Sequence, residues 1–99
     1  MTTQFSREVV IINKLGLHAR AASKLAQLSQ KFTATVTIEL AENSADANSI
    51  MGLMLLAGAQ GKTVKVIACG EDAERALTEI CQLFSDKFKI PYSLSMNSC

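Results

Sequence analysis

Residues 13–22, Asn-Lys-Leu-Gly-Leu-His-Ala-Arg-Ala-Ala, place the only histidine of the chain between a glycine and a run of helix-forming residues. Gly16 can adopt the positive φ of a tight turn, and the residues after His18 favour a helix. The stretch therefore predicts a turn followed by a helix that begins at or just after His18. The first turn of a helix has unpaired N–H groups and the positive end of the dipole, so this position suits an anion.

His18 and Arg20 have the chemistry of a phosphoryl site. The positive field at the helix start disfavours a protonated imidazole, so a ring nitrogen of His18 remains able to attack phosphorus or to accept a proton. A phosphoryl group on that nitrogen would meet backbone N–H groups and the Arg20 guanidinium together. These residues alone leave a structural alternative open, in which His18 only caps the helix and Arg20 is solvated.

Composition limits the possible classes of protein. The 99 residues are 48% hydrophobic and 19% charged with a net charge of +1, which predicts one globular domain without a general attraction to nucleic acid. No apolar run is long enough to span a bilayer, and no secretory leader is apparent, so we expect a cytoplasmic protein without membrane insertion. The three cysteines lack the spacing of a disulfide framework or a zinc site. We expect Cys69 and Cys81 to be packing residues and Cys99 to be an exposed thiol.

Alternation of residue type predicts the strands, and helical spacing predicts the helices. Residues 33–40, Thr-Ala-Thr-Val-Thr-Ile-Glu-Leu, alternate most cleanly between apolar and polar. The predicted strands cover residues 7–12, 33–40, 44–47 and 62–69, after a polar leader at residues 1–6. The predicted helices cover residues 19–30, a segment from residue 50 capped by Asn48 or Ser49, and a segment from residue 73. We expect the end of the first strand to be buried on both faces.

The order of these elements predicts an α+β fold. Each helix has one apolar face, and the strands suffice for one sheet, so the economical arrangement is an open-faced sandwich with the helices on one side. Residues 1–88 form the predicted domain, and the polar residues 89–99 are expected to be a flexible tail.

Residues 14–20 and 48–54 resemble the two signature stretches of the HPr family, the histidine-containing phosphocarriers of the phosphoenolpyruvate:sugar phosphotransferase system. The resemblance extends from about Arg7 to Phe88, and it implies the βαββαβα fold with a four-stranded antiparallel sheet and three helices on one face. The opening Asn-Lys-Leu-Gly and the junction at residues 47–49 also resemble the nitrogen-related NPr branch, whose output is regulation rather than sugar uptake.

The resemblance implies that His18 accepts a phosphoryl group on Nδ1 from the phosphohistidine of enzyme I, which phosphoenolpyruvate charges. His18 then passes the group to a histidine of a IIA-type domain. Arg20 and the backbone N–H groups of Ala19 and Arg20 would hold the phosphoryl oxygens. The carrier would be a monomer that needs no metal or cofactor, and a transfer partner rather than a stand-alone enzyme.

Ser49 corresponds to the regulatory serine of the family, which in some bacteria is phosphorylated by the ATP-dependent HPr kinase/phosphorylase. The structural alternative is that Ser49 is only a helix cap. The added phosphate would oppose docking of an acidic partner beside His18.

An apolar stripe of this kind is ordinarily core, but the resemblance implies that part of it forms the surface on which partners dock. Methionine suits a surface that must fit several partners. We expect Met51 and Met54 to be partly exposed, with Leu53 and Leu56 inward. The implied docking residues are Leu17, Ile50, Met51 and Met54.

Two features depart from the family pattern. Ala21 stands where most members have proline, which gives a less rigid helix start but one more N–H donor. The tail beyond Phe88 also exceeds the usual end of the family. Two rival interpretations remain: a regulatory module that acts through Ser49 without carrying phosphate, although relatives of that type lack the histidine, and an unrelated α+β interaction domain.

Overall fold

The computed structural model describes residues 4–88, which fold into four strands and three helices in the order βαββαβα. The strands are β1 (Gln4–Val10), β2 (Thr35–Leu40), β3 (Asn43–Asp46) and β4 (Thr63–Cys69). The helices are α1 (Ala19–Ser29), α2 (Ile50–Leu55) and α3 (Ala73–Ser85).

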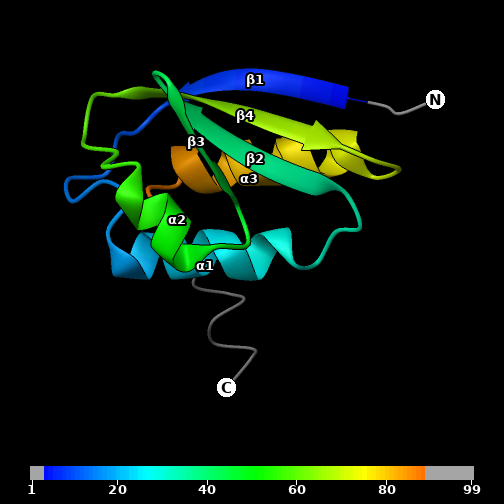
Figure 1. Ribbon diagram of the computed structural model, residues 1–99, viewed down its shortest axis with the longest axis horizontal. Coiled ribbons are helices and arrows are strands. Elements are labelled where there is room, and N and C mark those ends of the chain that lie inside the picture. Colours follow the sequence, from blue (N-terminus) through cyan, green and yellow to red (C-terminus); the bar gives the residue numbers. More distant parts are fainter. Residues whose placement is uncertain (1–3, 89–99) are drawn as a thin grey trace.

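The four strands form one antiparallel sheet in the order β1-β4-β2-β3, and the helices lie on one side of it (Figure 1). β4 is central, because Cys69 pairs with Gln4 of β1 and with Thr35 of β2. The predicted open-faced α+β sandwich is confirmed.

The alternation in β2 and β4 separates a core face from an outer face, as a half-buried sheet requires. Toward the helices, Val36, Ile38 and Val66 are fully buried. On the outer face, Lys65 of β4 lies opposite Glu8 of β1 and Glu39 of β2. The largest buried side chains of the helices that cover the core are Leu25, Leu53, Leu77, Ile80 and Phe84.

β1 differs from its prediction at both ends. It begins at Gln4, because residues 4–6 pair with residues 67–69 of β4, and Phe5 among them packs against the core. It ends at Val10, and the chain then leaves the sheet, so Ile11 is buried while Ile12 is exposed. The prediction that the end of this strand is buried on both faces is therefore wrong. The other boundaries differ from their predictions by one or two residues.

Three long-range hydrogen bonds at helix ends set the arrangement of the helices. The Ser29 hydroxyl at the end of α1 donates to Asn48 Oδ1 at 2.9 Å, so Asn48 joins α1 to the start of α2 while Ser49 caps α2. Asp72, which precedes α3, accepts from the backbone N–H groups of Thr33 at 3.0 Å and Ala34 at 2.8 Å. Its carboxylate thus joins the start of α3 to the start of β2 instead of capping its own helix.

Cys69 and Cys81 are free thiols, with Cys69 partly exposed and Cys81 buried. Burial raises the pKa of the Cys81 thiol, and the positive charge of Arg7 partly opposes that shift. Cys99 and the predicted tail at residues 89–99 lie outside the described residues. Among residues 4–88, none of the helices has the length and apolar character to cross a membrane.

We predict that Asp72→Asn lowers the melting temperature near neutral pH. Burial alone would raise the pKa of the Asp72 carboxyl, but the hydrogen bonds from Thr33 and Ala34 outweigh this effect, so the net pKa lies below its usual range. The carboxylate therefore stabilises the fold above the unfolded pKa, and this stabilisation disappears as the pH falls through the folded pKa. Circular dichroism melts should show the difference from wild type at about pH 7 and its loss once the pH falls through the lowered folded pKa of Asp72. Glu71→Gln, which removes the adjacent exposed charge, serves as the control, and an equal effect of both changes would contradict the prediction.

Candidate functional site

The connection between β1 and α1 is held by the connection between α2 and β4. Leu17 N–H donates to the Gly58 carbonyl at 2.8 Å, and Gly61 N–H donates to the Ile11 carbonyl at 2.8 Å. The Gln60 side chain adds a bond to the Ile12 carbonyl at 3.1 Å. These bonds fix the backbone on both sides of the turn that leads into His18.

Gly16 is required at the turn for two reasons. Its φ is +64°, a conformation that side chains with a Cβ disfavour. A Cβ at this position would also overlap the carbonyl oxygen of Gly58. The close approach of these two glycines therefore depends on the absence of a side chain at position 16.

Asn13 closes the same turn from within. Its Nδ2 donates to the Gly16 carbonyl at 2.7 Å, and the side chain is buried. Its Oδ1 is buried and accepts no hydrogen bond from the residues that the structure describes. The Asn13 side chain thus closes the turn with its Nδ2, while its Oδ1 stays buried without a partner among the described residues.

His18 is the N-cap of α1, as the sequence predicted, and its ring is directed at the first turn of the helix. Its backbone is extended, and Nδ1 accepts from the Arg20 N–H at 3.3 Å. A ring nitrogen that accepts a hydrogen bond carries no proton, so the proton of a neutral ring resides on Nε2. Nδ1 is therefore the nitrogen with an available lone pair, and its long hydrogen bond is easily exchanged for another.

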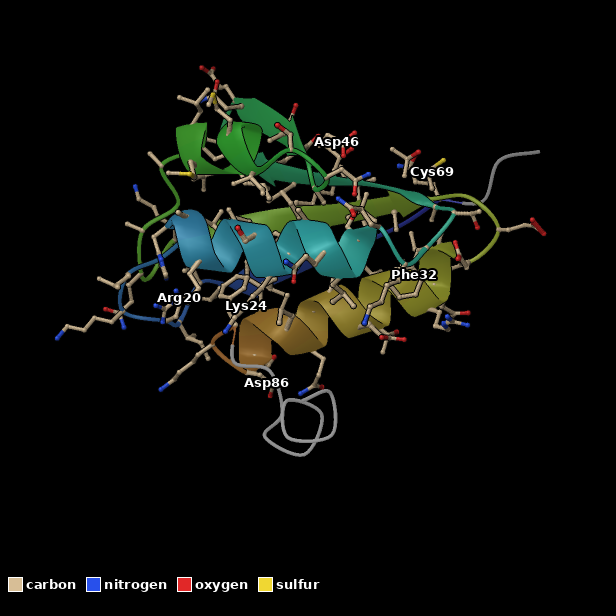
Figure 2. The ribbon with its side chains drawn as sticks, turned by 90° about the horizontal axis from the view of Figure 1, so that it is seen from below. Arg20, Lys24, Phe32, Asp46, Cys69 and Asp86 are labelled. Carbon is tan, nitrogen blue, oxygen red and sulfur yellow. The ribbon has the colours of Figure 1, made fainter. Side chains whose placement is uncertain are left out.

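A hollow of about 390 Å³ lies beside His18, with basic residues around it and no acidic residue in its lining. Figure 2 shows Arg20 and Lys24 at the edge of α1 that faces the C-terminal end of α3, where Asp86 lies. The basic residues of the lining are Lys14, Arg20, Lys24 and Lys87.

Part of this hollow was not predicted from the sequence. Lys24 was not singled out from the sequence, yet it is half-buried and lines the hollow. Its spacing of four residues from Arg20 was a usable signal, because residues at that spacing share a helix face. Lys87 and Gln60 gave no local signal, since they reach the hollow from distant connections.

α2 presents an apolar surface next to Ser49. Met51 is 72% exposed and Met54 is 45% exposed, while Leu53 and Leu56 are buried, which confirms the expected orientation of the helix. Ile50 is also exposed. Two leucines are exposed as well, Leu55 of this helix and Leu15 of the turn before α1.

Leu17 differs from its expected place on the docking surface. It is only 4% exposed and belongs to the core, because its backbone bond to Gly58 draws it under the connection after α2. Its side chain therefore holds the turn to the core, and too little of it is exposed for direct contact with a partner.

Ser49 is exposed and caps α2. Its Oγ accepts from the Gly52 N–H at 3.0 Å. The structural role that the sequence analysis considered for this residue is thus present, and its exposure leaves the hydroxyl accessible. Within residues 4–88, no group of three or more His, Cys, Asp or Glu side chains is placed to hold a metal ion.

Comparisons with known proteins agree on one family. The family described as the PTS HPr component phosphorylation site matches residues 5–86. The phosphocarrier protein NPr of Shewanella violacea is 49% identical over 86 residues, covering 87% of this chain and 94% of that protein. The phosphocarrier protein HPr of Xylella fastidiosa is 43% identical over 81 residues, covering 82% and 91%. A solved structure of HPr from Thermoanaerobacter tengcongensis superposes with a TM-score of 0.83 at 37% identity, covering 88% of this chain and 98% of that one.

We predict that Gly16→Ala destabilises the protein by at least about 2 kcal/mol, because it adds a steric overlap to the cost of a left-handed alanine. Gly61→Ala is the matched control, since Gly61 also has a positive φ of +91° but nothing within 4 Å of an added Cβ. Its cost should stay near ~1 kcal/mol. Urea unfolding of the three proteins measures both values, and equal losses would show that the contact with Gly58 contributes nothing.

Proposed function

This chain belongs to the HPr family of the phosphotransferase system, and from that premise we propose that His18 accepts a phosphoryl group from phospho-enzyme I and passes it to a IIA-type domain. The observation that carries the proposal is the orientation of the His18 ring, whose Nδ1 faces the first-turn N–H groups of α1. An unprotonated ring nitrogen thus lies beside several N–H donors that can bind an anion.

The transfer itself requires only positioning and charge stabilisation. As the P–N bond to the donor histidine breaks, its electron pair returns to the donor ring, and the Nδ1 lone pair of His18 forms the new P–N bond. The Nε2 proton of His18 stays in place. The Arg20 N–H, which donates to Nδ1 before transfer, can then donate to a phosphoryl oxygen.

Other groups at the helix start complete the set of donors. The N–H groups of Ala19 and Ala21 belong to the first turn of α1, where helical N–H groups have no intrahelical partner. Ala21 adds a donor that a proline at this position would lack. The Arg20 guanidinium lines the adjacent hollow and supplies fixed positive charge.

Docking is assigned to the exposed apolar side chains of α2. Ile50, Met51 and Met54 are exposed beside the His18 face, and the flexible methionines can adapt to more than one partner. The proposed carrier acts as a monomer in the cytoplasm. Relatives named NPr and HPr both match, so the proposal covers the transfer step that carriers of sugar uptake and of nitrogen-related regulation would share.

We predict that incubation with phosphoenolpyruvate and a bacterial enzyme I adds a single acid-labile phosphate to the wild-type protein and none to His18→Ala. Intact-mass spectrometry before and after acid treatment measures both. Circular dichroism verifies that the variant is folded, because it also loses the side-chain cap of α1. If several enzymes I leave the wild type unmodified, the carrier role is wrong and the regulatory module acting through Ser49 becomes the better interpretation.

Ser49 supports a second, regulatory role, because its exposed hydroxyl lies at the start of the helix that carries the docking residues. An HPr kinase/phosphorylase acting there would place negative charge beside the surface that partners contact. The charge would then weaken docking without altering His18 itself.

We predict that Ser49→Asp slows phosphorylation of His18 by enzyme I by about tenfold or more, since one lost interaction of ~1.4 kcal/mol has that effect. Ser49→Asn is the matched control, because asparagine caps a helix as well as serine and adds no charge. Initial rates of phosphate incorporation measure the difference. A similar reduction in both variants would attribute the effect to the cap rather than to charge.

A further inference from the structure

α3 ends in an unusual backbone conformation. After the C-cap residue Asp86, both Lys87 and Phe88 have positive φ, +58° and +62°. Residues with a Cβ seldom adopt this conformation, and glycine is the residue usually found just beyond a helix C-cap. Strain of this kind is retained where the surrounding structure imposes it.

The packing of Phe88 explains why the chain turns back after α3. Phe88 is buried, its ring meets the Phe84 ring edge-on at 4.8 Å between centroids, and its N–H donates to the Leu83 carbonyl at 2.9 Å. These contacts require a left-handed turn after α3. They do not require a lysine in it, because the Lys87 side chain is exposed and glycine would reach the same conformation with less strain.

Lys87 lies where its charged side chain can act on an anion bound beside His18. It lines the hollow beside His18 from the α3 side, while Arg20 and Lys24 line it from α1. Within residues 4–88 the one ion pair joins Arg75 to Glu79, so the four basic residues of the hollow have no acidic partner in the part of the chain that is described. Like charges around one hollow repel, and an anion placed among them relieves that repulsion.

We propose that Lys87 is a binding residue for the phosphoryl group, whose ammonium holds the dianion from the side opposite to the first turn of α1. The inference rests on the proposed role of His18 as phosphoryl acceptor and extends it to a group from the other end of the chain. A lysine at a helix C-terminus can also stabilise the helix dipole. That structural role would alter stability without altering anion binding.

Four variants separate the two roles. Lys87→Gln removes the charge, Lys87→Arg retains it, and Lys87→Gly removes both the charge and the backbone strain. Lys31→Gln is the control, because Lys31 is an exposed lysine just beyond the far end of α1, about 18 Å from His18 along the helix axis.

The first measurement is titration with inorganic phosphate alone, followed by the NMR shifts of the Ala19 and Arg20 amides. We expect Lys87→Gln and Lys87→Gly to weaken phosphate binding by about two- to fivefold, as one partly screened charge should. Lys87→Arg and Lys31→Gln should bind as wild type does. Lys87→Gly should at the same time melt at a higher temperature than wild type, so that stability and binding change in opposite directions.

The second measurement is the equilibrium of phosphoryl transfer with enzyme I, which should shift toward the donor by a similar factor in Lys87→Gln. Unchanged phosphate binding in both neutral variants, or no saturable binding by the wild type, overturns the proposal. Failure of every enzyme I to phosphorylate His18 would instead remove the proposed function. The phosphate titration needs no enzyme, so it decides the role of Lys87 in anion binding in either case.

Discussion

The close approach of Gly16 to Gly58 is the constraint on which the site depends. The backbone of the turn before α1 rests directly against the connection after α2, and the Leu17 N–H bonds to the Gly58 carbonyl there. Leu17 is consequently held in the core, and His18 follows it at the start of α1. The histidine is thus presented by two connections that fix each other, rather than by a free loop. Such preorganisation suits the proposed phosphoryl transfer, which depends on positioning of the reacting nitrogen.

Charge is distributed so that a nearly neutral chain has a strongly positive site. The net charge of +1 gives no general attraction for anions, yet four basic residues surround one hollow whose lining has no carboxylate. The acidic residues lie elsewhere, for example Glu8 and Glu39 opposite Lys65 on the outer face of the sheet. Local segregation of this kind concentrates the field where the phosphoryl group would be held, while the protein as a whole avoids non-specific binding to polyanions.

Sequence patterns predicted the features that depend on interactions between neighbouring residues. Alternation gave β2, and the glycine turn with the residues after His18 gave the start of α1 and its histidine cap. Features that depend on distant partners were not predictable. Residues 4–6 lack a clear strand pattern and join the sheet only because β4 is beside them. The hydrogen bonds that the Asp72 carboxylate accepts from Thr33 and Ala34 join residues 39 and 38 positions apart in the sequence. The burial of Leu17 and the position of Lys87 likewise follow from tertiary contacts that no short window contains.

The limited burial of α2 bears on how such proteins diverge. Of its six residues only Leu53 is buried, so the helix is attached to the core by one side chain, by its cap at Ser49 and by the connections at either end. The exposed Met51 and Met54 contribute little to the packing of the domain. Substitutions at these positions can therefore accumulate with almost no loss of stability, whereas those at Gly16 or in the core cannot. With α2 as the proposed docking surface, partner choice could change on this helix while the fold and the histidine remain unchanged, so that one scaffold would serve separate pathways.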